Sequence, residues 1–378
     1  MRVEFFKHNI GVEEVESVSE VLKSTFLTTG PVTQSFENEF SEFLGVESTI
    51  GVSSCTNALF LTLTAWGIGP GDEVIVPAQT FITTANVVLH RGAKPVFVDV
   101  EPQTGNIDIG KVEAAITNKT KVIIPVHMYG QMVDMKKLRE VSDRHDIKIL
   151  EDSAHTIEAS RDGFGPGQLG DAACFSFYAT KNITSGEGGA IATNDKALAE
   201  TLKILRNHGM SKSAADRYQN NYRHWDMELL GYKSNMNDIQ AALLRPQLKK
   251  NEKVWQRKYE IAKSYQKYFK AKNIEFPIDL ESSKHGYHLF TIWVDSKFRD
   301  QILNQLQSQG IGVAVNYRAV PTLSYYRRKF GFKGGEFPIA EDIGMRTISL
   351  PFYAKLTDSE VDHVCKTVSD IVDLNVKE

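Results

Sequence analysis

The stretch DAACFSFYATKNITSGEGGAIATND, residues 171–195, contains two short apolar segments separated by a lysine and a glycine-rich turn. The segments Cys174–Tyr178 and Ala190–Thr193 have the composition of buried strands. Lys181 lies between them, and burial disfavours the charged form of a lysine and lowers its pKa. A neutral amine is the form that a Schiff base with an aldehyde cofactor requires. The stretch alone leaves a second interpretation open, a surface lysine at the end of a hairpin.

Upstream of this stretch, short apolar segments alternate with helical patterns. Strands that alternate with helices of about 10–15 residues indicate βαβ units and a mainly parallel sheet with helices on both faces. Ligands of such sheets bind beyond the carboxyl ends of the strands. We expect strands at residues 48–52, 73–76, 95–100, 121–125 and 148–151, and helices at residues 12–23, 32–44, 58–66, 81–91, 109–115 and 134–145.

The chain after residue 195 has a different pattern. Residues 208–233 are polar and rich in aromatic residues, which favours an ordered loop at an active site or a subunit contact. A long helix is expected over Asp238–Lys270, with a bend near Pro246. We predict a large α/β domain at residues 1–250 and a small α+β domain at residues 251–378. The small domain should contain strands at residues 288–294 and 313–317 and helices at residues 296–310 and 357–372.

The composition excludes several classes of protein. The net charge of −3 over 378 residues gives no basic surface for nucleic acid or an anionic membrane. No apolar run approaches the roughly 18–20 residues of a membrane span, and the first residues show no signal-peptide core. Cys55, Cys174 and Cys365 are scattered and form no metal-ligand spacing. We therefore expect a cytoplasmic protein without a metal, a nucleic-acid partner or a membrane partner.

Polar or aromatic residues follow several of the predicted strands. Residues 53–57 offer hydroxyls and backbone N–H groups at a helix start, which suits a phosphate or simple N-capping. Asp152 either caps a following helix or keeps the ring nitrogen of a cofactor protonated. His155 is either a buried structural histidine or a cofactor contact. Phe81 is either a core aromatic or a residue that stacks on a planar cofactor.

Five stretches together resemble the sugar aminotransferases of the DegT/DnrJ/EryC1/StrS family. Their order and spacing match, and the similarity extends over nearly the whole chain. The resemblance implies a fold-type I enzyme that uses pyridoxal 5′-phosphate and works as a homodimer. The stretches are VSSCTNAL (52–59), GDEVIVPAQTFITTAN (71–86), ILEDSAHTIEAS (149–160), GDAACFSFYATKNITSGEGGAIATND (170–195) and GYKSNMNDIQAAL (231–243).

The resemblance also implies roles around the cofactor ring. Lys181 matches the catalytic lysine that forms the Schiff base and then acts as general base. Asp152 matches the partner of the pyridine nitrogen, and Phe81 matches the aromatic residue stacked on the ring. His155 stands where many members carry glutamine near the ring.

The cofactor phosphate is assigned in the same way. Ser54, Cys55 and Ser176 match the residues that hold the phosphate. Cys55 departs from the usual glycine, alanine or threonine, although its backbone N–H serves regardless of the side chain. Asn235 matches the asparagine that reaches the phosphate of the neighbouring subunit's cofactor, which implies a homodimer with shared active sites.

The segments 181–189 and 310–331 are most similar to members that act on UDP-linked 4-keto sugars. This similarity implies transfer of an amino group from L-glutamate to C4 of such a sugar, for amino-sugar, lipopolysaccharide and other polysaccharide biosynthesis. Transfer at C3, a cyclitol substrate and a non-catalytic regulatory protein are the alternatives. Arginine forks suit phosphates, so the candidates for binding the nucleotide diphosphate are Arg217, Tyr218, Tyr317 and Arg318, with ordinary surface positions as the alternative. Glu187 is a further candidate for binding the substrate.

Overall fold

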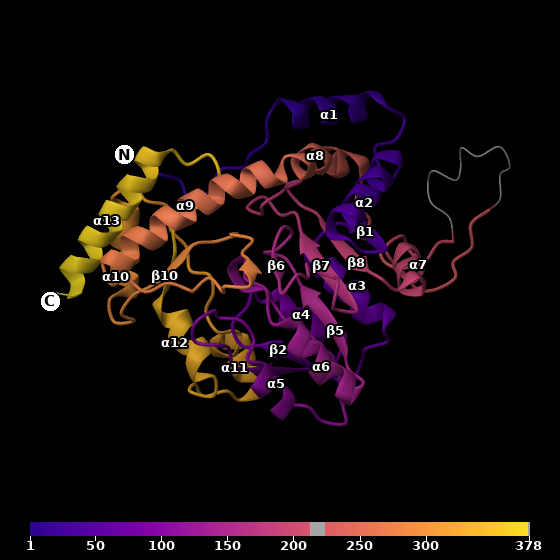
Figure 1. The fold of residues 1–378 in the computed structure, drawn as a ribbon. Coiled ribbons are helices and arrows are strands. Elements are labelled where there is room, and N and C mark those ends of the chain that lie inside the picture. Colours follow the sequence, from indigo (N-terminus) through magenta and orange to yellow (C-terminus); the bar gives the residue numbers. More distant parts are fainter. Residues whose placement is uncertain (212–223, 377–378) are drawn as a thin grey trace.

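The computed structural model describes residues 1–211 and 224–376 of the chain. Arg217 and Tyr218 therefore lie outside the described residues. A sheet of seven strands forms the centre of the molecule, in the order β1-β8-β7-β5-β4-β2-β3 (Figure 1). Its strands are β1 (Ser48–Val52), β2 (Glu73–Pro77), β3 (Lys94–Val98), β4 (Thr120–Ile123), β5 (Lys148–Asp152), β7 (Ala172–Ser176) and β8 (Gly189–Thr193).

The sheet is mostly parallel. The pairs β7–β5, β5–β4, β4–β2 and β2–β3 are parallel, whereas β8 runs antiparallel to both of its neighbours, β1 and β7. The carboxyl ends of all strands except β8 therefore meet at one edge, where a ligand site is expected. The predicted α/β class with a mostly parallel sheet is confirmed.

Both faces of the sheet are buried, which explains why its strands are apolar at consecutive positions. On β7, Ala172 and Cys174 belong to the core beneath α3, whereas Ala173 and Phe175 belong to the core beneath α2 and α8. The helices that cover the sheet are α2 (Pro31–Leu44), α3 (Cys55–Ala65), α4 (Thr83–His90), α5 (Ile109–Ala114), α6 (Met135–His145), α7 (Lys196–Leu205) and α8 (Asp238–Lys249).

The long helix expected over residues 238–270 is divided in two. Helix α8 ends at Lys249 and α9 (Asn251–Ala271) follows it, so the predicted bend near Pro246 is wrong by four residues (Figure 1). Lys250 separates the helices, and its Nζ lies 2.6 Å from Oε1 of the buried Glu14 in α1 (Val12–Lys23). The boundary predicted between the two domains, residues 1–250 and 251–378, lies at this junction between α8 and α9.

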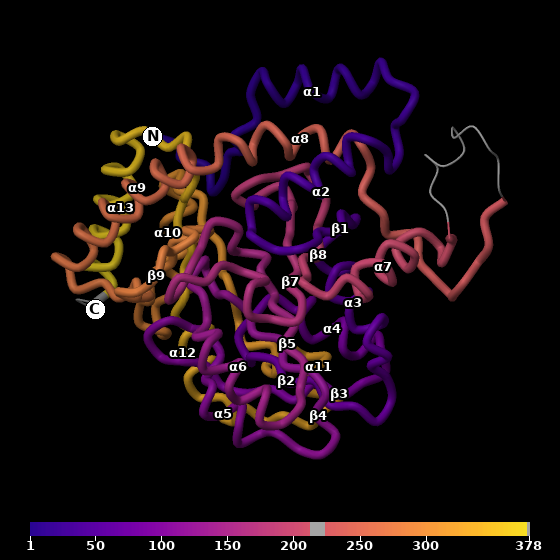
Figure 2. The backbone as a smooth tube through the Cα atoms, turned by 45° about the vertical axis from the view of Figure 1, so that its right-hand side comes forward, coloured from indigo at the N-terminus to yellow at the C-terminus, as the bar shows by residue number. Residues whose placement is uncertain are grey.

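A second core forms around α9 and the C-terminal residues. Val3 joins this core and pairs with Ile311, so the N-terminus lies beside α9 and α13 (Figure 2). The predicted strand at residues 288–294 is limited to β10, and that at 313–317 is absent except for a single bridge from Ala314 to Ser349. The remaining elements are β6 (Ser160–Arg161), β9 (Ser283–Lys284), β10 (Thr291–Trp293), α10 (Arg299–Ser308), α11 (Ser324–Phe330), α12 (Pro338–Arg346), β11 (Thr347–Ser349) and α13 (Asp358–Val376).

Candidate active site

A cavity of about 540 Å³ lies at the carboxyl ends of β5 and β7 and the start of α3. This is the edge of a parallel sheet at which ligands bind. The cavity brings together residues that are up to 312 positions apart in the sequence (from Phe5 to Tyr317). The predicted site residues that line it are Ser54, Cys55, Phe81, Asp152, His155, Ser176, Lys181, Glu187 and Tyr317.

Lys181 follows β7 in a turn, in which its backbone N–H donates to the carbonyl of Tyr178 (2.9 Å). The side chain is half-buried in the cavity wall. Burial lowers the pKa of the amine to about 8, although the nearby Cys55 and Asp152 oppose this shift. The amine is therefore available in its neutral form near neutral pH, as a nucleophile or a general base requires.

Asp152 is the last residue of β5, and its carboxylate is held by neutral donors. Thr84 Oγ1 donates to Oδ2 (2.8 Å), and the Ala154 N–H donates to Oδ1 (3.2 Å). Burial raises the pKa of this carboxyl, while these two hydrogen bonds oppose the shift. No helix begins in residues 153–159, so the helix-capping interpretation of Asp152 is wrong. A buried carboxylate of this kind favours a protonated nitrogen opposite it.

The start of α3 has the features of an anion site. Ser54 caps the helix, because its Oγ accepts the Asn57 N–H (3.1 Å), so N-capping by this residue is confirmed. The other N–H groups of the first turn have no acceptor within the helix and carry the positive end of its dipole. A Cβ atom on Gly189 would lie 2.6 Å from the Cys55 nitrogen, so β8 approaches this turn closely only because residue 189 is glycine. Ser176 lines the same end of the cavity.

His155 also lines the cavity. Its Nδ1 accepts the Tyr129 N–H (3.3 Å), and its Nε2 lies 3.2 Å from the Tyr317 hydroxyl. Burial, together with the charge of Lys181, holds the pKa of His155 well below its ordinary value. The imidazole is therefore neutral, and acceptance at Nδ1 places the proton on Nε2.

Phe81 and the half-buried Tyr317 lie side by side in the lining of the cavity. Phe81 is 53% exposed, so the interpretation as a core aromatic is wrong. Its ring centroid lies 5.9 Å from that of Tyr317. Glu187 is exposed on the cavity wall, and its carbonyl accepts a hydrogen bond from Gln240 (2.7 Å). An open wall with aromatic and acidic side chains suits a polar substrate that enters after the cofactor.

Two predicted site residues do not line this cavity. Asn235 pairs with Val52 of β1, and its side chain binds Thr29 Oγ1 and Lys233 Nζ, each at 2.6 Å. Arg318 is exposed beside Tyr317. Within one described chain, neither residue reaches the site.

Several residues of the site were missed in the sequence. Thr84 binds Asp152, and His288 approaches Lys181, with His288 Nε2 and Lys181 Nζ 3.4 Å apart. Phe5 and Asn316 also line the cavity. His288 was expected in a strand, and no local pattern marks it, since its position depends on contacts with Tyr129 far along the chain.

A buried polar network fixes the residue that follows Lys181. Asn182 Nδ2 donates to Glu158 Oε1 (2.6 Å) and to the Gly286 carbonyl (2.8 Å), while Lys258 Nζ donates to Asn182 Oδ1 (2.7 Å). Burial lowers the pKa of Lys258 to about 8 and raises that of Glu158. The network therefore connects the turn that contains Lys181 to α9.

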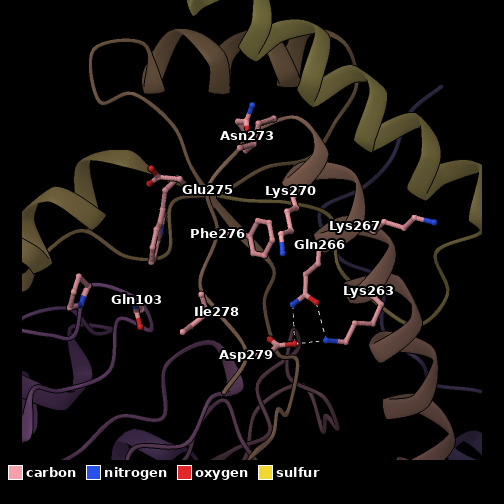
Figure 3. Close-up of a pocket in the computed structure, with 13 residues that line it drawn as sticks. Gln103, Lys263, Gln266, Lys267, Lys270, Asn273, Glu275, Phe276, Ile278 and Asp279 are labelled. Atoms are coloured by element: carbon pink, nitrogen blue, oxygen red, sulfur yellow. Dashed lines mark hydrogen bonds and ion pairs between the residues drawn. The ribbon is translucent and has the colours of Figure 1, made fainter. Parts of the chain in front are cut away.

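A larger hollow, of about 920 Å³, lies between α9 and residues 273–279 (Figure 3). Asp279 on its wall is already paired, because Lys263 Nζ lies 2.8 Å and Gln266 Nε2 lies 3.0 Å from Asp279 Oδ2. None of the predicted site residues lines it. The chemistry therefore centres on the smaller cavity.

The described part of the chain contains neither a cluster of metal ligands nor a helix that could span a membrane. Within residues 1–211 and 224–376, no group of three or more histidine, cysteine or acidic side chains is arranged to hold a metal ion. No helix in the same residues combines the length and apolar character needed to cross a membrane.

The residues present fit pyridoxal 5′-phosphate. The start of α3 would hold the phosphate, the neutral Lys181 amine would react with the aldehyde, and Asp152 would face the ring nitrogen. These three groups come from three separate elements and line one cavity.

Comparison with known proteins agrees with this fit. Residues 8–369 match the model of the DegT/DnrJ/EryC1/StrS aminotransferase family. The chain is 43% identical to the spore coat polysaccharide biosynthesis protein SpsC of Bacillus subtilis (strain 168), over 96% of this chain and 95% of SpsC.

Solved structures are similar over the whole chain. Spr1654 from Streptococcus pneumoniae in its PMP form has a TM-score of 0.93 and 32% identity, over 98% of this chain and 99% of Spr1654, and it is also known in a PLP form. PseC of Helicobacter pylori, an aminotransferase involved in the biosynthesis of pseudoaminic acid, has a TM-score of 0.92 and 31% identity, over 99% of this chain and 100% of PseC.

Proposed function

Because the chain belongs to the DegT/DnrJ/EryC1/StrS aminotransferase family and depends on pyridoxal 5′-phosphate, we propose that it moves an amino group from L-glutamate to C4 of a UDP-linked 4-keto sugar. The observation that carries the proposal is the single cavity shared by Lys181, Asp152 and the start of α3. The bound cofactor would supply an electron sink for the carbanion formed when the donor loses its Cα proton.

The residues of the chain have distinct tasks in this proposal. Lys181 holds the cofactor in the resting enzyme and afterwards carries the proton as a general base, for which a pKa of about 8 is suited. Asp152 keeps the ring nitrogen protonated. His155 and Phe81 contact the ring, and Ser54, Cys55 and Ser176 hold the phosphate. The neutral His155 adds no charge that would compete with the protonated ring.

The substrate class is supported by the relatives and by the exposed side of the cavity. SpsC takes part in spore coat polysaccharide biosynthesis, and PseC in the biosynthesis of pseudoaminic acid. Tyr317 lines the cavity beside the exposed Phe81, and Arg318 is exposed next to Tyr317, where a diphosphate could accept an arginine fork. We assign Glu187, Tyr317 and Arg318, with Arg217 and Tyr218, to the nucleotide sugar.

The enzyme is proposed to be a cytoplasmic homodimer with shared active sites. The side chain of Asn235 supports this, because it does not line the cavity of its own chain and, among residues 1–211 and 224–376, its hydrogen bonds go to Thr29, Lys233 and a backbone carbonyl. From a partner subunit it could reach the cofactor phosphate.

The substrate can be tested with the enzyme in its amine-carrying form. We expect rapid single turnover with UDP-4-keto-6-deoxy-N-acetylhexosamine and a product whose NMR spectrum shows the amine at C4. Turnover only with a 3-keto sugar nucleotide would contradict transfer at C4, and turnover only with a free cyclitol ketone would contradict a nucleotide-linked substrate.

A further inference from the structure

His288 is held against Lys181 by the backbone of a distant segment. The backbone N–H of His288 donates to the Tyr129 carbonyl (3.0 Å). Two residues earlier, the backbone N–H of Gly286 donates to the Gly130 carbonyl (2.8 Å). This double contact directs the His288 ring into the cavity, where Nε2 lies 3.4 Å from Lys181 Nζ. The side chain is only 4% exposed, so its place is fixed by the fold.

The second ring nitrogen of His288 has an unusual environment. Nδ1 is buried and has no hydrogen-bond partner within residues 1–211 and 224–376. A buried polar atom without a partner destabilises a protein, and most buried polar atoms are paired. A histidine retained only for packing would gain from an apolar replacement, so the arrangement points to a use for Nε2.

The groups that face His288 keep it neutral. Burial is the main cause that holds its pKa well below the ordinary value, and the charges of Lys181, His155 and Lys258 add to it. The His155 ring packs against it with the ring centroids 4.3 Å apart. On its other side, Lys181 faces Cys55 and Asp152. A neutral imidazole with its proton on Nδ1 offers Nε2 as an acceptor.

We infer that His288 Nε2 accepts a hydrogen bond from the Lys181 amine whenever this lysine is not bonded to the cofactor. The inference rests on the proposed role of Lys181. Donation of one N–H to His288 leaves the amine lone pair free to point into the cavity, toward the proton that the base must take. Once the amine is protonated, the same hydrogen bond becomes charge-assisted and stronger. His288 thus positions the base and increases its proton affinity.

Three substitutions separate this role from packing. His288→Phe keeps a ring of similar size and removes the acceptor. His288→Gln places an amide oxygen near the position of Nε2, whereas His288→Asn is one methylene too short to do so. His285→Gln is the matched control, because His285 is buried on the same segment but does not line the cavity.

The first readout uses cofactor-free protein, in which labelling of Lys181 by trinitrobenzenesulfonate is followed against pH by mass spectrometry. The wild type and His285→Gln should label with a midpoint near pH 8. His288→Phe and His288→Asn should lower the midpoint by about one pH unit. His288→Gln should keep the midpoint close to that of the wild type. Equal midpoints in all variants, or no difference between the glutamine and asparagine variants, would overturn the inference.

The second readout is transfer of the Cα proton, measured in a single turnover with glutamate and α-deuterated glutamate. In His288→Phe we expect the rate to fall at least about tenfold and the isotope effect to rise, with partial recovery in His288→Gln. Borohydride reduction of the wild-type holoenzyme, followed by peptide mapping, separates the two possible failures. A cofactor attached elsewhere than Lys181 would refute the proposed function, whereas attachment at Lys181 with unchanged labelling and isotope effect would refute only the role of His288.

Discussion

Thr84 Oγ1 lies 2.8 Å from Asp152 Oδ2, so a hydroxyl of α4 holds the carboxylate that ends β5. The Thr80 hydroxyl lies 2.9 Å from the same Thr84 oxygen and can donate to it. Donation from Thr84 fixes the orientation of the carboxylate and favours its charged form, against the effect of burial. The ability of Asp152 to keep a ring nitrogen protonated therefore depends on a residue that is not itself charged.

Replacing Thr84 should weaken cofactor binding. Thr84→Val keeps the shape of the side chain but removes the donor to Asp152, and a hydrogen bond to a charged group contributes about 1.5–3 kcal/mol. We expect the dissociation constant of pyridoxal 5′-phosphate to rise at least about tenfold, as measured by absorbance titration. Thr84→Ser, which retains the hydroxyl, is the control. Equal affinities of the valine and serine variants would show that the contact is unimportant.

The pKa of Lys181 predicts how stability depends on pH in the cofactor-free protein. The folded amine has a pKa of about 8, against 10.5 in the unfolded chain, so between these pH values the unfolded state binds more protons. The free energy of unfolding should therefore rise with pH across this window, by about 2 kcal/mol from this residue.

Lys181→Met removes this contribution while leaving Lys258, whose pKa is also about 8, in place. Urea unfolding at pH 7.5 and pH 10 should show a smaller rise for the methionine variant than for the wild type. The methionine variant should also be the more stable of the two at pH 7.5. Parallel pH curves for the two proteins would contradict the lowered pKa.

The buried ion pair between Arg206 and Glu37 should be important for folding. Arg206 Nη1 binds Glu37 Oε1 and the Gly51 carbonyl, next to the turn proposed to hold the phosphate. Glu37→Ala leaves a buried charge without its partner, which should cost about 3–5 kcal/mol of unfolding free energy. Glu39→Ala, on the same helix, breaks a more exposed pair with Arg245 and should cost less than about 1 kcal/mol. Similar losses in urea unfolding would contradict this account.

The proposed role of Asn235 across the subunit interface can be tested by complementation. Lys181→Ala and Asn235→Ala chains should each have little activity alone. After unfolding and refolding together, a random mixture forms hybrid dimers in half of the cases, each with one complete site, so activity should reach roughly a quarter of the wild type. No recovery would mean that Asn235 acts within its own chain or has no role at the site.

The main elements of the sheet could be predicted from the sequence because its strands are buried on both faces. Residues 73–77 are buried throughout, so apolar residues run continuously and the polar turn that follows is conspicuous. The same change from an apolar strand to a polar segment identified Asp152 and Lys181 as candidate site residues. The resemblance to the aminotransferase family then implied their roles. All seven strands were expected close to their observed positions.

Contacts between distant residues explain what could not be predicted. Lys250, at the break between α8 and α9, contacts the buried Glu14, more than 200 residues away in the sequence. His288 reaches the cavity because Gly130 allows a close approach: a Cβ atom there would lie 2.7 Å from the Tyr287 nitrogen. Neither contact leaves a local pattern, so the local alternation around His288 suggested a strand instead.

The central claim is that Lys181 binds the cofactor in the resting enzyme and, once released from it, acts as the general base in both halves of an amino transfer. The most direct test is the absorbance band of the lysine-bound cofactor, recorded while L-glutamate and then UDP-4-keto-6-deoxy-N-acetylhexosamine are added. We predict that the band disappears with glutamate and returns with the keto sugar in the wild type, and that it is absent in Lys181→Ala. A band that persists in Lys181→Ala, or one that glutamate and other amino donors leave unchanged in the wild type, would contradict the account.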